Sequence, residues 1–233
     1  MEEFLTAHFW IAVGQIILID ILLGGDNAVV IALACRKLPP AQRLKGILWG
    51  TAGAIGLRVV LIAFALTLLA VPYLKLVGAA LLVWIGVKLL APGDDDDEHG
   101  NIESSDRLWA AVKTVIVADL VMSIDNVIAI AGAATNAGEQ QQMPLVIFGL
   151  LVSVPIIVWG SQLVLKLMDR FPFIITLGGM LLGWIAGTMA HTDPAVRDWL
   201  PQDPAWNYAL GIAGAVLVYL LGLVSRRRAA QSG

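Results

Sequence analysis

The sequence predicts an all-α integral membrane protein with seven transmembrane helices. Hydrophobic residues make up 58% of the 233-residue chain, charged residues make up 14%, and the mean hydropathy is +0.81. Soluble globular proteins are about half apolar and about a quarter charged, so a lipid bilayer is the expected solvent of this chain. Seven apolar stretches, each near the ~20 residues that a helix needs to cross a bilayer, predict the number of spans.

The predicted spans form a single transmembrane domain over residues 1–233 and leave no room for a sizeable soluble domain. Two polar linkers separate them: an acidic loop at 92–107, with its acidic residues at 94–98, and a proline-containing segment at 191–205. We expect the second linker to form an ordered, non-helical cap. The spans, in order, are 9–34, 46–70, 72–91, 109–134, 144–166, 172–190 and 206–225.

The first span is predicted to be retained rather than cleaved as a leader. The opening MEEFLTAHFW carries two acids and no Lys or Arg, the reverse of a signal peptide. The ALAC that ends at Cys35 resembles a lipoprotein cleavage box, but a cleavable apolar core is not expected to contain Asp20 and Asp26. As the one cysteine of the chain, Cys35 also excludes an internal disulfide and a cysteine-rich metal site.

The basic residues predict the orientation. They follow spans one, five and seven and flank the loop after span three, so seven spans place them all on one side, opposite Arg197 and Lys75. Because cytoplasmic loops are enriched in Lys and Arg, we expect the N-terminus outside and the C-terminus in the cytoplasm. The residues on the cytoplasmic side are Arg36, Lys37, Arg43, Lys45, Lys88, Arg107, Lys113, Lys166, Arg170, Arg226, Arg227 and Arg228.

The two halves of the chain resemble each other. DILLGGDNAVVIALA at 20–34 aligns with DLVMSIDNVIAIAGA at 119–133, and VPYLKLVGAALLVWIG at 71–86 aligns with FPFIITLGGMLLGWIA at 171–186. Apolar helices align easily by chance, but acidic pairs at nearly the same offset favour a true repeat. The repeat units are 9–91 and 109–190, with 206–225 as a seventh helix. Three spans per unit invert the second copy, an architecture common among secondary transporters with sites near the membrane midplane.

Six Asp and Asn side chains lie within the first and fourth apolar spans. An ionised Asp at a helix centre costs ~2.5–3.5 kcal/mol, so such residues face a bundle interior or a cavity. Clustered carboxylates need positive partners, which here are protons, Arg58 or a metal cation. Carboxylate and amide oxygens suit Mg²⁺, Ca²⁺ and Mn²⁺, so this ligand set favours the metal. The candidate ligands are Asp20, Asp26, Asn27, Asp119, Asp125 and Asn126.

The helix geometry leaves one shared site or two separate sites open. On a straight helix Asp26 points about 120° away from Asp20, so one shared ion requires an unwound segment at Gly24-Gly25. The second copy has Ser123-Ile124 there. The alternative is that these polar residues only form hydrogen bonds between helices. Their matched spacing in both halves favours the ion site.

Other residues have two interpretations each. Arg58, the one basic residue inside a span, neutralises an aspartate until a cation displaces it, or forms a structural ion pair. Met122 is a soft metal ligand or, more commonly, a packing residue. Gly179, Gly183 and Gly187 form a GxxxGxxxG series that predicts close helix packing. With no Walker A or G-x-S-x-G motif and no strongly basic segment, neither an enzyme nor a nucleic-acid-binding protein is expected.

The two acidic motifs resemble those of the TerC family of bacterial membrane proteins. They read GGDNAVVIA at 24–32 and SIDNVIAIAG at 123–132, each with an acid six residues before the motif aspartate, and the resemblance extends over all seven spans. It implies a multi-pass protein of the bacterial inner membrane that exports a cation, most often Mn²⁺, with an architecture related to LysE-type exporters. It implies a metal-binding role for Asp20, Asp26, Asp119 and Asp125, with Asn27 and Asn126 beside them.

The predicted function is a secondary transporter that exports a divalent cation, Mn²⁺ first among the candidates, by alternating access and proton exchange. The cation is the substrate, and no permanently bound cofactor is expected. Two alternatives remain: a membrane-protein assembly or metal-loading partner, and a non-transporting stress sensor for which the acidic loop would matter most. The expected partners are the cation and the bilayer, with a homodimer or another membrane protein left open.

Overall fold

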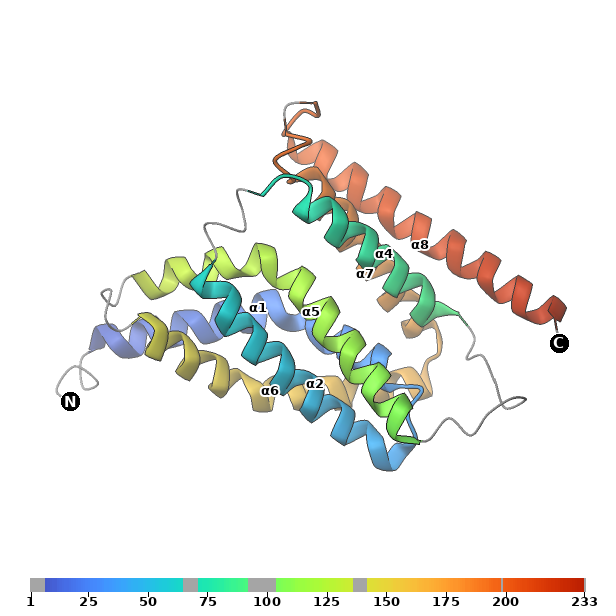
Figure 1. The fold of residues 1–233 in the computed structure, drawn as a ribbon, viewed down its shortest axis with the longest axis horizontal. Coiled ribbons are helices and arrows are strands. Elements are labelled where there is room, and N and C mark those ends of the chain that lie inside the picture. The colour runs from blue at the N-terminus through green and yellow to red at the C-terminus, as the bar shows by residue number, and fades with distance from the viewer. Residues whose placement is uncertain (1–6, 65–70, 92–103, 136–141, 198, 233) are drawn as a thin grey trace.

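The computed structural model describes residues 7–64, 71–91, 104–135, 142–197 and 199–232, and this part of the chain contains helices and turns but no strand. Figure 1 shows its seven helices. They are α1 (Ala7–Cys35), α2 (Pro40–Ala63), α4 (Leu74–Leu90), α5 (Ser104–Thr135), α6 (Gln142–Arg170), α7 (Phe173–His191) and α8 (Pro204–Ser232).

Each helix overlaps one of the predicted apolar stretches, and the boundaries differ at the ends. α2 begins at Pro40 rather than at residue 46, because the N–H that proline lacks has no partner in the first turn of a helix. α5 begins at Ser104, inside the predicted acidic loop, and the acidic Asp106 in its first turn favours a helix N-terminus. Residues 65–70 of the second span and 92–103 of the acidic loop lie outside the described residues.

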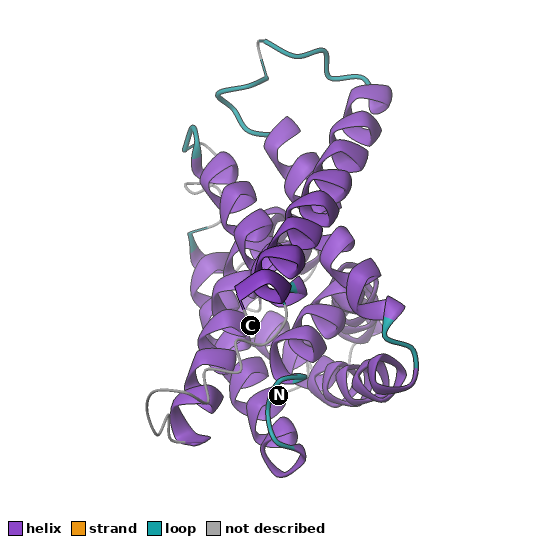
Figure 2. Cartoon of the chain, turned by 90° about the vertical axis from the view of Figure 1, so that its right-hand side faces the viewer, coloured by secondary structure: helices purple, strands orange, loops and turns teal. Residues whose placement is uncertain are grey.

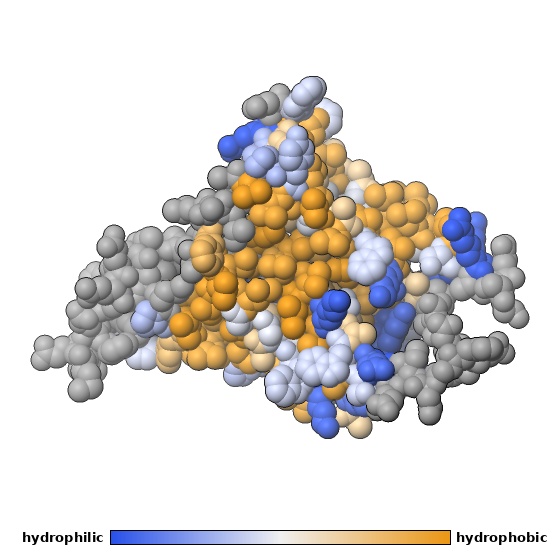
Figure 3. Space-filling view, in the orientation of Figure 1, coloured by the Kyte–Doolittle hydropathy of each residue, from blue (hydrophilic) through white to orange (hydrophobic). Residues whose placement is uncertain are grey.

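The face of the bundle that Figure 3 shows is largely apolar. Large side chains such as Trp49, Trp84 and Trp159 are 61%, 58% and 67% exposed. Apolar surface of this extent indicates contact with lipid. Four helices contain stretches long and apolar enough to cross a membrane, namely Pro40–Ile62, Val146–Arg170, Phe173–His191 and Pro204–Arg228. The chain is therefore a helical, multi-pass membrane protein.

The helices pack in two groups (Figure 1), and Figure 2 shows the same helices turned by 90°. In one group α7 packs on α4 and α8. In the other, α1 packs mainly on α6 and α2 mainly on α5, while α1 and α5 also contact each other. An apolar core that includes Leu33, Ile47, Val115 and Leu182 contains buried side chains from both groups and joins them.

The glycine series of α7 lies at close helix contacts, as predicted. A Cβ on Gly183 would overlap the carbonyl oxygen of Gly214, and a Cβ on Gly187 would overlap that of Leu210, both on α8. A Cβ on Gly179 would overlap the Leu90 side chain of α4. Small residues allow this close approach, which supplies packing energy that lipid cannot replace.

Basic side chains gather at one end of the bundle, hereafter the basic end, where α1, α4, α6 and α8 finish and α2 and α5 begin. Two arginines there bind terminal carbonyls of α4. Arg36 Nη2 donates to the Leu89 oxygen at 2.9 Å, and Arg226 Nε donates to the Leu90 oxygen at 3.0 Å. The last carbonyls of a helix have no partner within the helix, so these bonds both satisfy them and tie α1 and α8 to α4.

At the other end, the segment after α7 forms turns, consistent with the predicted cap. The fully buried Asp193 accepts backbone N–H bonds from Tyr73, Lys75, Leu76 and Ala195 at 2.7–3.2 Å. It thereby caps the start of α4, where Tyr73 has a left-handed φ of 67°. Burial acts to raise the pKa of Asp193, but the four donors outweigh it and hold that pKa below its usual range.

Candidate functional site

A buried ion pair joins α2 and α5. Arg58 is 2% exposed and Asp119 is 7% exposed, and Arg58 Nη2 donates to Asp119 Oδ1 at 2.5 Å. The two helices approach closely because Gly50 and Gly53 of α2 face Val115 and Ile116 of α5 without side chains of their own. The pair therefore lies inside the bundle, as the cost of charge in lipid requires.

Ser123 completes this arrangement, one helical turn after Asp119. Its fully buried hydroxyl accepts a bond from Arg58 Nε at 3.0 Å and donates to Asp119 Oδ2 at 3.1 Å. Both oxygens of Asp119 are thus engaged, one by Arg58 and the other by Ser123. A cation that binds Asp119 must displace one of these partners or share an oxygen with it.

Asp26 and Asn27 bring α1 to the same region. Asp26 is half-buried, and its Oδ1 accepts the backbone N–H of Asn27 at 2.9 Å. Its carboxylate interacts electrostatically with both Arg58 and Asp119, which places the charges of three helices in one neighbourhood. α1, α2 and α5 therefore supply an acid, a base and a second acid to one charged cluster, in which Arg58 and Asp119 are buried and Asp26 is half-buried.

Asn27 is 3% exposed, yet neither its amide oxygen nor its amide nitrogen has a hydrogen-bond partner among the described residues. A buried polar group left in this condition costs about 1–3 kcal/mol. Native proteins keep such groups where they serve a ligand or a moving part. The orphaned amide oxygen next to Asp26 is of the type that binds hard cations.

The remaining predicted residues are placed less completely. Asp20 lies in α1 and Asp125 in α5, but their side chains are outside the described part of the structure. Asn126 is half-buried and has an interaction partner. Met122 is 4% exposed and belongs to the apolar core, which is the packing role. Within the described residues, no three His, Cys, Asp or Glu side chains group closely enough to hold a metal ion.

The structure has no unwound segment at Gly24-Gly25, which one ion shared by Asp20 and Asp26 would require. α1 is a continuous helix from Ala7 to Cys35, and α5 is continuous through Ser123-Ile124. In a bilayer every broken backbone hydrogen bond needs a replacement, and a continuous helix avoids that cost. Asp26 and Asn27 therefore contribute side chains from a regular helix, with no backbone carbonyls freed beside them.

These features define a class: a multi-pass helical membrane protein that encloses a charged cluster, with acidic motifs on two of its helices. The chain belongs to the family described as "Integral membrane protein TerC family", whose model matches residues 5–230. The predicted family is thereby confirmed.

Relatives of similar length support this membership. The "Uncharacterized membrane protein YjbE" of Bacillus subtilis (strain 168) is 40% identical over 205 residues, which cover 88% of this chain and 90% of that protein. YceF of the same organism is 28% identical over 188 residues, covering 78% and 71%. The "UPF0053 inner membrane protein YgdQ" of Escherichia coli (strain K12) is 24% identical over 178 residues, covering 70% and 73%. No solved structure matches the chain.

Proposed function

We propose that this protein is a secondary transporter that exports a divalent metal cation, with Mn²⁺ as the substrate, from the cytoplasm of a bacterium. The observation that carries the proposal is the buried cluster of Asp26, Asn27, Arg58 and Asp119. Keeping two acids, a base and an unpaired amide inside an apolar bundle is expensive. Residues this costly within a membrane mark an ion pathway more often than a structural contact.

The ligands of the cation would be Asp20, Asp26, Asn27, Asp119, Asp125 and Asn126, all on α1 and α5. Arg58 would balance the negative charge of the Asp119 carboxylate until an entering cation displaces the arginine. Oxygen ligands of this kind fit Mn²⁺ and also Mg²⁺ and Ca²⁺, and the family resemblance favours Mn²⁺. The cation is cargo, so the proposal includes no resident cofactor and no enzymatic step. Protons would take the place of the metal on the return step.

We propose seven spans, with the basic end in the cytoplasm. The seven described helices, their apolar surface and the collection of Lys and Arg at one end all support this arrangement. The relative YgdQ is named an inner membrane protein, which supports the same location for this chain.

The helix packing supports an inverted repeat. Exchanging the two proposed units would interchange α1 with α5, α2 with α6 and α4 with α7. The contact between α1 and α6 would then become the contact between α5 and α2. Both contacts are among the most extensive in the bundle, and α4 also packs directly on α7. Alternating access would proceed by rocking one unit against the other around the charged cluster.

The test is ion flux into proteoliposomes with Mn²⁺, Ca²⁺, Mg²⁺, Zn²⁺ and Co²⁺. We expect Mn²⁺ flux from the wild type, loss of flux in Asp26→Asn and Asp125→Asn, and wild-type flux in the control Asp106→Asn. Asp106 is an exposed acid in the first turn of α5, so this control removes one charge without touching the cluster. Folded protein that moves no ion would overturn the proposal in favour of an assembly partner or a stress sensor.

A further inference from the structure

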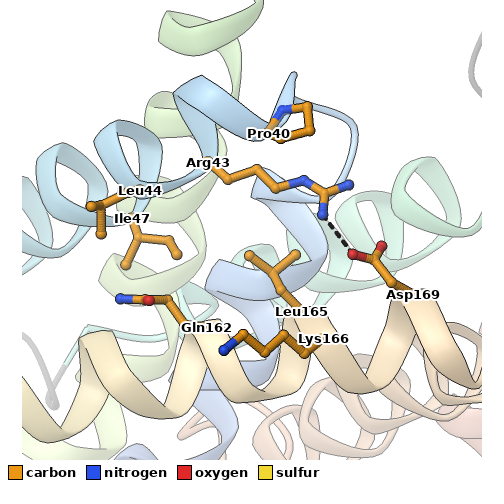
Figure 4. A pocket seen from close by; sticks show the side chains of 8 residues that line it. All are labelled: Pro40, Arg43, Leu44, Ile47, Gln162, Leu165, Lys166 and Asp169. Atoms are coloured by element: carbon orange, nitrogen blue, oxygen red, sulfur yellow. Dashed lines mark hydrogen bonds and ion pairs between the residues drawn. The ribbon is translucent and has the colours of Figure 1, made fainter.

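A pocket of about 220 Å³ lies at the basic end between α2 and α6 (Figure 4). Its polar lining includes Arg43, Lys166 and Asp169, and its buried apolar lining is Ile47 and Leu165. Ile47 is 0% exposed and Leu165 is 4% exposed, and both belong to the apolar core of the bundle. The pocket therefore reaches from the surface to the core and ends there.

Arg43 of α2 lies at the mouth of this pocket, where it contacts the end of α6 and the turn that follows α1. Its Nη1 lies 2.7 Å from Asp169 Oδ2 at the end of α6, and Figure 4 shows this contact across the pocket. Its Nε and Nη2 donate to the carbonyl oxygens of Leu38 and Arg36, just after α1. The ion pair is 25% and 55% exposed at its two side chains, so solvent weakens it. A weak, exposed pair between two helices suits a contact that must open repeatedly.

One face of α2 leads from the pocket to the charged cluster. Arg43, Ile47, Thr51, Ala54 and Arg58 follow one another at three- and four-residue intervals, so they lie on a single face. They span about 22 Å of helix at 1.5 Å per residue. Thr51 is 3% exposed, and its hydroxyl has no hydrogen-bond partner among the described residues. This face thus begins with the ion pair, passes an apolar layer and an unpaired hydroxyl, and ends at Arg58.

We propose that this pocket is the cytoplasmic entrance to the cation site and that Arg43 and Asp169 form its gate. Ile47 and Leu165 make the apolar layer beneath the gate. In the closed gate Arg43 neutralises Asp169, while Lys166 adds a positive charge that repels cations. Separation of α2 from α6 would open the apolar layer and free the Asp169 carboxylate to attract an entering cation. The inference rests on the transport function proposed above.

The test measures access to Thr51, which lies beyond the apolar layer. Cys35→Ala removes the one native thiol, and Thr51→Cys then places a single thiol on the proposed path at little change in size. Inside-out vesicles expose the basic end to a membrane-impermeant, charged methanethiosulfonate reagent. In this background we expect Asp169→Asn to raise the labelling rate about two- to fivefold, the range for an exposed ion pair. Asp106→Asn, which removes an exposed acid that does not line the pocket, should leave the rate unchanged.

Salt provides a second measurement that needs no further substitution. Labelling of the Thr51→Cys protein should accelerate from low salt to 0.5 M salt because exposed ion pairs are screened, and the Asp169→Asn protein should lose this dependence. Equal labelling rates in the Asp169→Asn and Asp106→Asn proteins would overturn the gate. The same salt dependence of labelling with and without Asp169→Asn would also overturn it. Labelling requires no transported ion. If the protein transports ions but Asp169→Asn does not change the labelling of Thr51→Cys, the proposed entrance is refuted and transport is not. If Asp169→Asn raises the labelling but no ion is transported, the proposed cation transport is refuted.

Discussion

Removing one charge of the buried pair is expected to destabilise the protein far more than removing both. Arg58→Met would leave the Asp119 carboxylate buried without its cationic partner, while the Ser123 hydroxyl would still donate to it. Breaking a buried pair from one side costs about 3–5 kcal/mol, and the remaining Ser123 hydrogen bond favours the lower end, about 3 kcal/mol. In Arg58→Met/Asp119→Leu neither charge remains, so we expect a free energy of unfolding within about 1 kcal/mol of the wild type.

The assay is reversible unfolding in detergent micelles, applied to the wild type, both single variants and the double variant. If each single variant loses about 3 kcal/mol and the double variant loses less than about 1 kcal/mol, the coupling energy of this double-mutant cycle is about 5 kcal/mol or more. Asp169→Asn is the matched control, because its ion pair is exposed and its loss should cost less than about 1 kcal/mol. Single variants that each cost under about 1 kcal/mol and add without coupling would show that the two charges are hydrated, and the buried-cluster argument would fail.

Two further predictions concern Asn27 and Asp193. Asn27→Leu should raise the free energy of unfolding by about 1–3 kcal/mol, because it removes buried polar atoms that have no partner among the described residues. The same substitution should abolish Mn²⁺ flux. A lower free energy of unfolding in Asn27→Leu would instead favour a hydrogen-bonding role for Asn27. The folded pKa of Asp193 is lowered, so its stabilisation is complete above the unfolded pKa of about 3.9 and is lost as pH falls through the folded pKa. Asp193→Asn should unfold more easily at pH 7, by about 1.5–3 kcal/mol, and should lose less stability than the wild type in acid-unfolding measurements.

The sequence was sufficient to predict the helices and the close packing of α7. Long apolar stretches identify spans without reference to their neighbours, and the glycine series of α7 predicted a close contact because small residues have few other uses there. Both interpretations that the sequence left open for Arg58 pair it with an aspartate, and the ion pair with Asp119 is consistent with both. Burial of an acid and a base in the same bundle is consistent with both, and only the packing of α2 on α5 brings the two together.

The missed residues depend on contacts between distant parts of the chain. Ser123 has no pattern of its own, and its role follows from the position of Arg58 on another helix. Asp193 lies in a proline-containing linker, while the N–H groups that it binds are mostly at the start of α4. A break at Gly24-Gly25 was needed only if Asp20 and Asp26 share one ion, and the sequence left two separate sites equally open. A regular α1 satisfies its own backbone and favours side-chain ligands from more than one helix.

The differences between the halves bear on the direction of transport. A perfect inverted repeat would be symmetric across the membrane, so any preferred direction must come from residues that differ between the two units. α2 carries Arg58 beside Asp119, whereas α6, its proposed counterpart, has no Lys or Arg before Lys166 and offers no such base to Asp20. The Arg43–Asp169 pair likewise joins α2 to the basic end of α6. Both asymmetries involve α2, and we therefore expect substitutions on its buried face to alter direction more than matched substitutions on α6.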